Sequence, residues 1–290
     1  MSALPARTTE AELPLAAKEP SQPLIGRRGS WAHRDSVRTS VRRLMCILGV
    51  LVIWQVLVVT GVLSTFAVAE PTAILRALGS LIPTAPFWSA VGDTLHTWGI
   101  GLTISLTIAV PIGVLLGSSH RAYRLVRVTI DFLRTIPPVA VLPLALLLYG
   151  ATERMVLVLV VFGSVWPLLL QSMYGVHQVD PVSRDVARSY QFRRRELVFG
   201  VILPAAAPFI ATGIRIAATV SLLLVVGAEL LGGASGLGLS IALAQQSQQI
   251  PAMYAFVVVT AVLGLLLNLG LLRLERRILS WHSPYRGRAA

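Results

Sequence analysis

Six long apolar stretches constrain the fold of this chain more than any other feature of its sequence. They cover residues 44–66, 94–117, 128–149, 155–176, 205–231 and 252–272. Each contains about the 20 residues that an α-helix, rising about 1.5 Å per residue, needs to cross a hydrocarbon core about 30 Å thick. The sequence therefore predicts an all-α, polytopic membrane protein with six transmembrane helices.

The composition independently supports a lipid environment. Hydrophobic residues make up 55% of the chain and charged residues only 13%, which would overfill the core of a water-soluble domain. A net charge of +12 is also typical of nucleic-acid-binding proteins. Here the basic residues are distributed over several loops rather than gathered on one soluble face, so we expect the lipid bilayer, and no nucleic acid, as a partner.

The placement of arginine predicts the orientation, because the cytoplasmic flanks of transmembrane helices retain an excess of Lys and Arg. Eight basic residues precede the first apolar stretch, three lie at 118–127, five at 177–204, and five follow residue 272. The opposite side has only Arg76 and Arg154. Both termini are therefore expected to be cytoplasmic.

The sequence divides into one transmembrane domain, residues 44–282, and two cytoplasmic tails. Residues 1–43 are expected to be disordered, and they do not resemble a cleavable signal peptide, because the first apolar stretch begins at 44 and is long enough to span. Residues 283–290 form the second tail. On the other side, residues 71–82 are amphipathic, and residues 232–251 carry no charge and are expected to face outward. The single cysteine, Cys46, excludes a disulfide within the chain and a thiolate metal site.

A basic loop at 177–204 separates the fourth and fifth apolar stretches. Asp180 can cap a helix, and Pro181 fits its first turn, so a helix is expected to begin at 181. Its periodicity predicts two faces. The residues expected to pack against the protein are Val182, Val186 and Ala187, and those expected to face outward are Arg184, Arg188 and Ser189. A second amphipathic stretch, residues 193–203, follows after a break.

This loop resembles the EAA loop of ABC importer permeases. The family pattern is Glu-Ala-Ala, three residues, Gly, nine residues, Ile, one residue and Leu-Pro. The matching positions in this chain are Asp185, Val186, Ala187, Gln191, Val201, Leu203 and Pro204. The spacing is kept throughout, and Gln191 in place of Gly is the clear departure from the pattern.

Two further segments are similar to the nitrate, sulfonate and taurine branch of these permeases. Residues 132–150 contain Leu-Arg, nearby prolines and Leu-Pro-Leu in that order, and residues 203–238 contain Gly-Ile-Arg, Ala-Glu and Gly-Leu-Gly. With the C-terminal 274–281, the resemblance extends over residues 45–282.

The resemblance implies the permease subunit of a type I ABC importer in a bacterial plasma or inner membrane. A dimer of cytoplasmic ABC ATPases is expected to dock on the 177–204 loop, an extracytoplasmic binding protein to deliver the solute, and a second copy of the permease to complete a homodimer. The solutes of this branch include sulfonates, taurine and nitrate, and similar permeases import precursors of thiamine and other heterocycles. The subunit itself is expected to be no enzyme and to need no cofactor.

Four residues in the apolar stretches are candidates for a pathway or gate: Arg134, Pro138, Arg215 and Glu229. Ionisable groups within a membrane cost free energy, and prolines break helices. Each also has a structural explanation, since Arg134 can pair locally with Asp131, Pro138 can be a static kink, Arg215 can reach the cytoplasmic interface, and Glu229 can cap adjacent backbone or lie among headgroups. Arg215 and Glu229 are about 21 Å apart along one helix and are not expected to pair.

Gln191 leads to a specific conformational prediction. A glycine at that position of the family pattern permits a left-handed backbone between two short helices. The unchanged spacing from Asp185 to Leu203 leaves no extra residue for another path, so we expect Gln191 itself to adopt a positive φ.

Two other classes of protein remain as alternatives. A stand-alone secondary carrier or channel would require paired intramembrane ionisable residues and inverted repeats, and a membrane-embedded enzyme would require a cluster of His, Asp, Ser or Cys at one depth. Neither pattern is evident in the sequence, and its histidines lack metal-ligand spacing.

Overall fold

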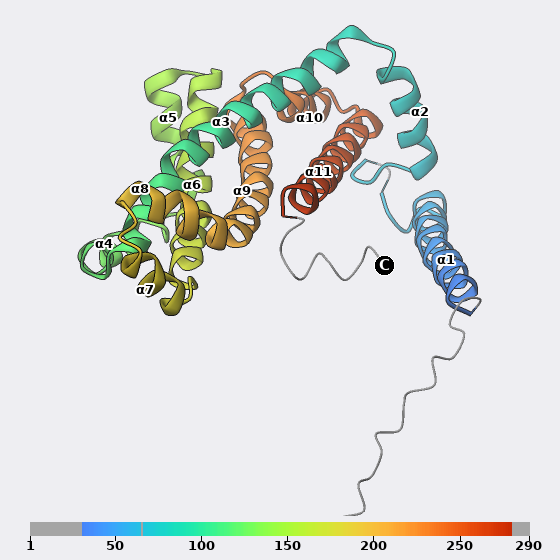
Figure 1. Ribbon diagram of the computed structural model, residues 1–290. Coiled ribbons are helices and arrows are strands. Elements are labelled where there is room, and N and C mark those ends of the chain that lie inside the picture. Colours follow the sequence, from blue (N-terminus) through green and yellow to red (C-terminus); the bar gives the residue numbers. More distant parts are fainter. Residues whose placement is uncertain (1–30, 65, 280–290) are drawn as a thin grey trace, which may run out of the picture. The chain divides into compact units, whose positions relative to one another are not determined.

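The computed structural model describes residues 31–64 and 66–279, and every regular element in these ranges is a helix (Figure 1). The chain divides into two units at Val52–Ile53. Helix α1 (Trp31–Val59) contains that boundary, and the other helices belong to the second unit. Helix α1 begins inside the 1–43 segment that was expected to be disordered, because residues 31–43 contain no Pro or Gly to end the helix. The tail 283–290 lies outside the described residues.

Three long helices form the centre of the second unit. Helix α6 (Glu153–His177) packs along both α3 (Ala85–Ser118) and α9 (Leu203–Gly232). Small residues let the backbones approach closely, because a Cβ on Gly113 of α3 would lie 2.8 Å from the carbonyl oxygen of Leu169 in α6. The buried residues at this contact are Leu102, Ala109, Leu168, Leu169, Met173, Ala217 and Ala218.

Four helical stretches of the described chain are long and apolar enough to cross a membrane. They are α3, α6, the stretch Arg194–Gln246 that contains α9, and α11 (Ile250–Ile278). The third apolar stretch of the sequence forms a bent pair instead, in which α4 (His120–Leu133) is followed by η1 (Pro138–Val141) and α5 (Leu142–Tyr149), with a bend of 75°. Pro137 and Pro138 lack the N–H groups needed to continue α4.

The first apolar stretch is shorter as a helix than the sequence suggested. Its apolar helical part covers only Met45–Val59, because the chain turns at Thr60 and Gly61. The φ of Gly61 is 77°. The described residues therefore contain four helical stretches long and apolar enough to span a membrane, or five if the bent pair crosses once, and the count of six stays a prediction.

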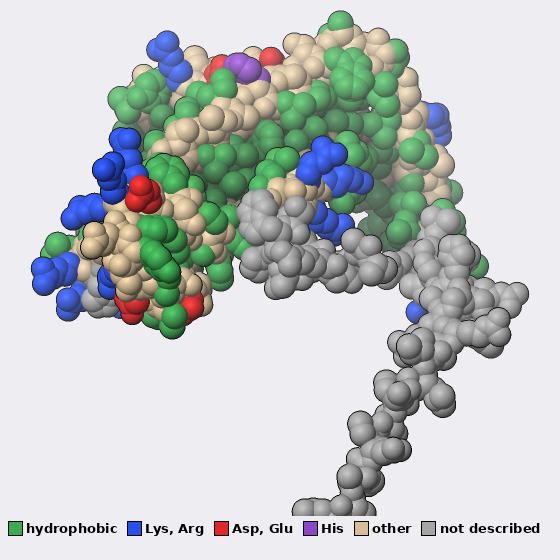
Figure 2. All heavy atoms as spheres, viewed as in Figure 1, with side chains coloured by type: hydrophobic (Ala, Val, Ile, Leu, Met, Phe, Trp, Pro, Cys, Tyr) green, Lys and Arg blue, Asp and Glu red, His purple; other side chains and the backbone are tan. Residues whose placement is uncertain are grey.

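Two short helices flank α11. Helix α2 (Pro71–Leu81) matches the amphipathic stretch predicted at 71–82 and buries Ile74 in a cluster with Ala69 and Ala255. Helix α10 (Leu237–Gln246) lies within the uncharged segment 232–251 and packs against α9, α11 and α3. Figure 2 shows that Lys and Arg side chains gather over α4, α7 and α8 and at the C-terminal end of α11, while hydrophobic side chains cover much of the visible surface.

Candidate functional site

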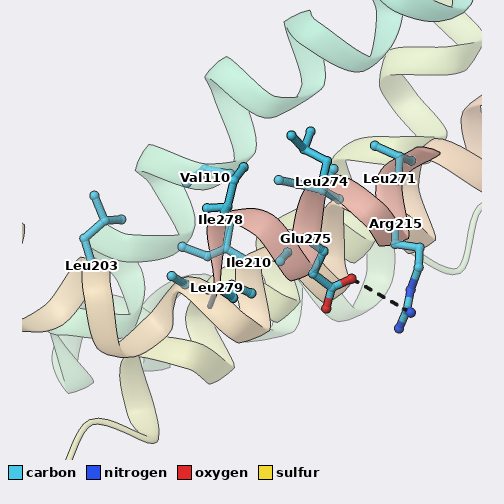
Figure 3. Close-up of a pocket in the computed structure, with 12 residues that line it drawn as sticks. Val110, Leu203, Ile210, Arg215, Leu271, Leu274, Glu275, Ile278 and Leu279 are labelled. Atoms are coloured by element: carbon cyan, nitrogen blue, oxygen red, sulfur yellow. Dashed lines mark ion pairs between the residues drawn. The ribbon is translucent and has the colours of Figure 1, made fainter. Parts of the chain in front are cut away.

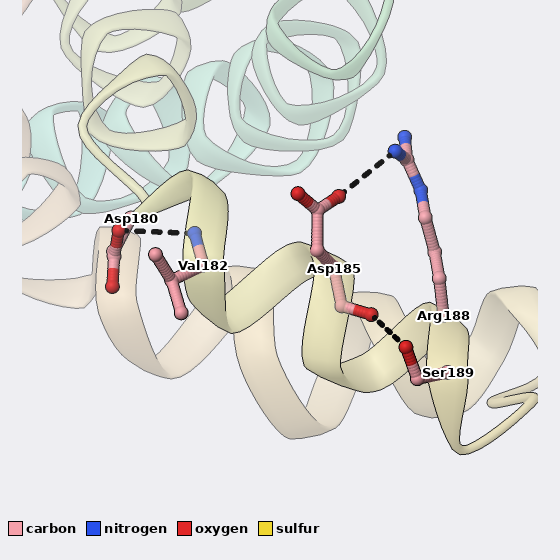
Figure 4. A network of polar contacts seen from close by, with 5 residues as sticks. All are labelled: Asp180, Val182, Asp185, Arg188 and Ser189. Atoms are coloured by element: carbon pink, nitrogen blue, oxygen red, sulfur yellow. Dashed lines mark hydrogen bonds and ion pairs between the residues drawn. The ribbon is translucent and has the colours of Figure 1, made fainter.

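The coupling segment, defined here as residues 177–204, contains two short helices and a π-helical turn. These are α7 (Pro181–Ser189), α8 (Arg194–Leu197) and η2 (Val198–Ile202). The predicted start of α7 is confirmed, because an Asp180 carboxylate oxygen accepts a hydrogen bond from the Val182 N–H at 3.1 Å (Figure 4). Asp185 pairs with Arg188 at 3.2 Å, and the Ser189 hydroxyl donates to the Asp185 carbonyl.

The predicted faces of α7 are partly wrong. Ala187 is buried, with 3% of its surface exposed, and Arg188 and Ser189 face outward as expected. Val182 and Val186, however, are 65% and 49% exposed.

Arg184 turns inward rather than outward and donates a hydrogen bond to the carbonyl of Val176 at the end of α6. The negative end of a helix attracts a cation, and this interaction orients α7 so that its valines lie on the surface. The coupling segment therefore presents apolar side chains to its surroundings.

Gln191 has a φ of 54°, which confirms the predicted left-handed backbone. The Phe192 N–H donates to the Ala187 carbonyl, and the Gln191 N–H donates to the Arg188 carbonyl. These two bonds form a Schellman motif that ends α7, with Gln191 at the position where glycine is usual. A residue with a β-carbon therefore occupies a conformation that costs about 1 kcal/mol.

The end of the coupling segment is attached to the long helices. The Leu203 N–H donates to the carbonyl of Val198, five residues earlier, and Pro204 follows in the first turn of α9. Ile202 is buried in a cluster with Val114 of α3 and Val176 of α6, while Val201 and Leu203 are half-buried at its edge. A displacement of the coupling segment would therefore be transmitted to three helices.

The break after α4 contains two of the candidate pathway residues. Arg134 pairs with Asp131 at 3.2 Å, as the sequence predicted, and Asp131 also lies 3.6 Å from Arg127. Pro138 packs against α6 at Gly163, where an added Cβ would lie 3.0 Å from the proline ring. Arg134 therefore has a local partner, and Pro138 fills a contact that only glycine permits.

Glu229 is fully buried and participates in a network that joins three elements. The Thr94 hydroxyl, from α3, lies 2.9 and 3.0 Å from the two carboxylate oxygens of Glu229. The first two N–H groups of α10 complete the network, because Leu237 donates to Thr94 Oγ1 and Gly238 donates to Glu229 Oε2, both at 2.9 Å. Glu229 thus caps backbone, which was the structural alternative recognised in the sequence.

Two glycines make room for this carboxylate. A Cβ on Gly236, where φ is 148°, would lie 2.2 Å from the carboxyl carbon of Glu229. A Cβ on Gly238 would lie 2.3 Å from the Val226 carbonyl oxygen and 2.6 Å from the Glu229 Cβ. The Gly-Leu-Gly sequence is therefore explained by the close approach of α10 to α9.

Arg215 and Glu229 do not pair with each other, which agrees with the prediction from their spacing. Its guanidinium lies 3.9 Å from a carboxylate oxygen of Glu275 in α11, at the side of a cavity of about 280 Å³ between α3, α9 and α11 (Figure 3). Ten of the twelve residues that line this cavity are apolar, among them Val110, Ile210 and Leu274.

Sequence reasoning missed Thr94 and Glu275, the partners of the two charged candidates. Thr94 lies 135 residues from Glu229, and no local pattern connects them. Glu275 lies in the C-terminal segment 274–281, which the sequence singles out only by its resemblance to the family. Within residues 31–64 and 66–279, no group of three or more His, Cys, Asp or Glu residues could hold a metal ion. The arrangement combines an exposed segment attached to long helices with a buried polar network that fixes a turn.

Comparison with known proteins gives a family match over residues 109–280, to the family described as binding-protein-dependent transport system inner membrane component. The chain is 32% identical to a putative aliphatic sulfonates transport permease protein of Bacillus subtilis, over 82% of this chain and 86% of the relative. It is 30% identical to a nitrate import permease protein of Synechocystis, over 79% and 85% of the two chains. It is 28% identical to a taurine transport system permease protein of Escherichia coli, over 87% and 92%.

Among solved structures, the chain resembles an inward-facing MetNI methionine ABC transporter, with a TM-score of 0.58 and 19% identity. The match covers 67% of this chain and 96% of that one. At this identity the likeness concerns the fold.

Proposed function

Because this chain belongs to the family of binding-protein-dependent transport system inner membrane components, we propose that it is the membrane-spanning subunit of an ATP-driven importer of small anions. Family membership makes it a multi-pass ABC importer permease, and its fold is that of type I importer permeases. The finer proposals concern its partners, its orientation and its solute. The observation that carries the proposed docking of an ATPase is the geometry of the coupling segment.

The coupling segment has the properties of a docking surface for an ATPase. Val182 and Val186 are exposed on α7, and Tyr190 and Phe192 are exposed at its end, so apolar side chains lie together on an otherwise basic loop. Such a patch at the surface of a protein marks an interaction site. In this proposal Asp185, Val186, Ala187 and Gln191 form the docked helix and its turn, and Val201, Leu203 and Pro204 transmit its movement to α9.

The other subunits of the proposed transporter follow from the family. Two cytoplasmic ABC ATPases would supply the energy, an extracytoplasmic binding protein would deliver the solute, and a second copy of this chain would complete the pathway. Residues 44–282 would form the permease domain, with the tails 1–43 and 283–290 in the cytoplasm. Arg134, Pro138, Arg215 and Glu229 remain the candidates to influence the pathway, and we assign Glu229 the task of holding the turn between α9 and α10.

The relatives indicate the class of solute. Their names describe import of aliphatic sulfonates, nitrate and taurine. Each of these solutes is an oxyanion or contains one, sulfonate or nitrate, so we propose a small solute of this kind.

Reconstitution with an ABC ATPase and a binding protein from the same organism tests the function. The native complex is expected to take up a radiolabelled sulfonate, taurine or nitrate in an ATP-dependent manner. Val186→Asp, at an exposed position, and Ala187→Arg, at a buried one, are expected to abolish uptake and stimulation of the ATPase while the permease stays inserted. Ser80→Arg, on exposed α2, is the control and is expected to retain uptake. Uptake without an ATPase would instead favour a stand-alone carrier.

Cysteine labelling tests the orientation. Ser235 and Ser189 are both exposed, so they form a matched pair once Cys46, the single cysteine, is replaced by Ala. In intact cells, Ser235→Cys is expected to react with an impermeant thiol reagent and Ser189→Cys is not. The reverse pattern would overturn the proposed orientation.

A further inference from the structure

A polar pocket of about 260 Å³ lies where α3 meets the turns that precede α6 and α10. Its polar lining residues are Asp93, His96, Thr97, Thr152, Glu153 and Ser235. Figure 2 shows acidic side chains on either side of a histidine on the visible face. Neither Lys nor Arg lines the pocket, although Arg154 follows Glu153 in α6 and is exposed.

The charges of this pocket are not balanced. His96 Nδ1 lies 3.1 Å from Glu153 Oε1, so these two groups are partners. The carboxylate of Asp93 is half-buried and has no hydrogen bond or ion pair with any residue in 31–64 or 66–279. The pocket therefore has an unpaired negative charge at its wall, which favours a cationic ligand.

Thr97 provides a second, independent observation. Only 5% of its surface is exposed, it lines the pocket, and its hydroxyl has no hydrogen-bond partner among the described residues. Because this hydroxyl lies at the pocket wall, it is available to hydrogen-bond with a ligand. Because Asp93 and Thr97 are four residues apart on α3, they lie on the same face of that helix.

The pocket adjoins the network around Glu229. Asp93 precedes Thr94, which binds Glu229, and Ser235 precedes Gly236, which makes room for the Glu229 carboxylate. A ligand that contacts both Asp93 and Ser235 would touch the two segments that this network joins. Binding of such a ligand would therefore act directly on the turn between α9 and α10.

We propose that this pocket receives the ammonium or guanidinium group of a Lys or Arg side chain from the extracytoplasmic binding protein. The proposal rests on the proposed function, which supplies that partner. The Asp93 carboxylate would pair with the cation, and the hydroxyls of Thr97 and Ser235 would accept its remaining N–H groups. Nitrate and a simple sulfonate are excluded as the ligand, because Asp93 and Glu153 would repel them. The ammonium group of a zwitterionic solute such as taurine would be attracted, and in that case the reciprocal rescue in the second arm below would fail.

The first arm of the test uses the full chain in detergent and depends on no partner. With Cys46→Ala as background, Ser235→Cys is treated with methanethiosulfonates that carry either a trimethylammonium or a sulfonate group. Ser247→Cys, exposed in the same uncharged segment 232–251, is the control. We expect the modification rate with the cationic reagent, divided by the rate with the anionic reagent, to be at least about fivefold higher at 235 than at 247. Asp93→Asn is expected to remove that excess. Equal ratios at the two positions would overturn the proposal.

The second arm uses the binding protein that supports uptake in the reconstituted complex. Asp93→Lys is expected to weaken its docking at least about tenfold, and a Lys→Glu or Arg→Glu change on the binding protein is expected to restore docking to that variant and not to the native permease. If no basic residue of the binding protein shows this reciprocal rescue, the proposed source of the cation is wrong, even when the first arm succeeds. If uptake proves independent of any binding protein, the proposed function fails, and the first arm still reports whether the pocket binds a cation.

Discussion

The coupling segment and the network around Glu229 lie in the same unit of the protein and are built in opposite ways. In the coupling segment, Asp185 and Arg188 pair on the surface, two valines are exposed, and a glutamine occupies a strained backbone conformation. Around Glu229, the carboxylate, the Thr94 hydroxyl and the N–H groups of Leu237 and Gly238 are buried and hydrogen-bonded, and two glycines leave room for the close approach.

This difference indicates that the coupling segment can move and that the turn between α9 and α10 is rigid. A surface ion pair contributes little to stability, so α7 can be bound and displaced at low cost. A buried carboxylate that loses a partner is strongly destabilised, so the turn between α9 and α10 keeps one geometry. We infer that the protein holds one part rigid and leaves the other available to a partner.

The largest effect is expected where the rigid region has no space. In Gly238→Ala the new Cβ would meet the Val226 carbonyl and the Glu229 Cβ, and the backbone must shift to accept it. We expect a loss of about 3 kcal/mol in the free energy of unfolding. Gly227→Ala is the matched control in α9, because its Cβ would meet nothing within 4 Å. Thermal unfolding in detergent measures both variants, and equal stability would contradict the tight approach of α10.

A smaller loss is expected when the hydroxyl in the same network is removed. Thr94→Val keeps the shape of the side chain but leaves the Glu229 carboxylate and the Leu237 N–H without their shared partner. We expect a loss of about 2 kcal/mol. Thr94→Ser keeps the hydroxyl and should recover most of that loss. If Val and Ser variants unfold at the same temperature, the hydroxyl does not stabilise the turn.

Local features of the coupling segment could be predicted from the sequence, because they depend on neighbouring residues. The cap by Asp180 and the positive φ at Gln191 follow from spacing within a few residues. The orientation of α7 could not be predicted. It depends on the Val176 carbonyl at the end of α6, which binds Arg184 and turns Val182 outward.

The partners in the network around Glu229 could not be predicted from the sequence. Its carboxylate was recognised in the sequence as costly, but its partner Thr94 comes from a helix 135 residues away. Similarly, the sequence marks Pro138 as a possible kink within one span, whereas the bend of 75° and the packing of α5 against α6 appear only in the fold. Sequence periodicity identifies spans and breaks, whereas the partners across the bundle require the fold.

In the coupling segment, removal of the helix cap is expected to have a larger effect on stability than the change at Gln191. Asp180→Ala removes the acceptor for the Val182 N–H, and we expect α7 to lose about 1 kcal/mol of stability. Asp180→Ser retains a capping oxygen and is the control. Hydrogen exchange at the amides of α7 measures this change locally, and it should leave the exchange of α9 unaltered. Faster exchange in α9 as well would mean that the Asp180 cap stabilises more than α7 itself.

The smallest expected effect is a gain, at the strained glutamine. Gln191→Gly removes a side chain that disfavours the left-handed backbone, which releases about 1 kcal/mol, but glycine also loses more conformational entropy on folding, so we expect a net gain of about 0.5 kcal/mol. Gln248 offers a matched control, because it has nearly the same φ, 56° against 54°, and lies outside the coupling segment. Gln248→Gly should give a similar gain in thermal stability. Both variants should retain ATP-dependent uptake, since the turn itself is unchanged. If Gln191→Gly alone abolishes uptake while Gln248→Gly does not, the glutamine side chain contributes to docking, and the conformation of the Schellman turn is not its only contribution to coupling.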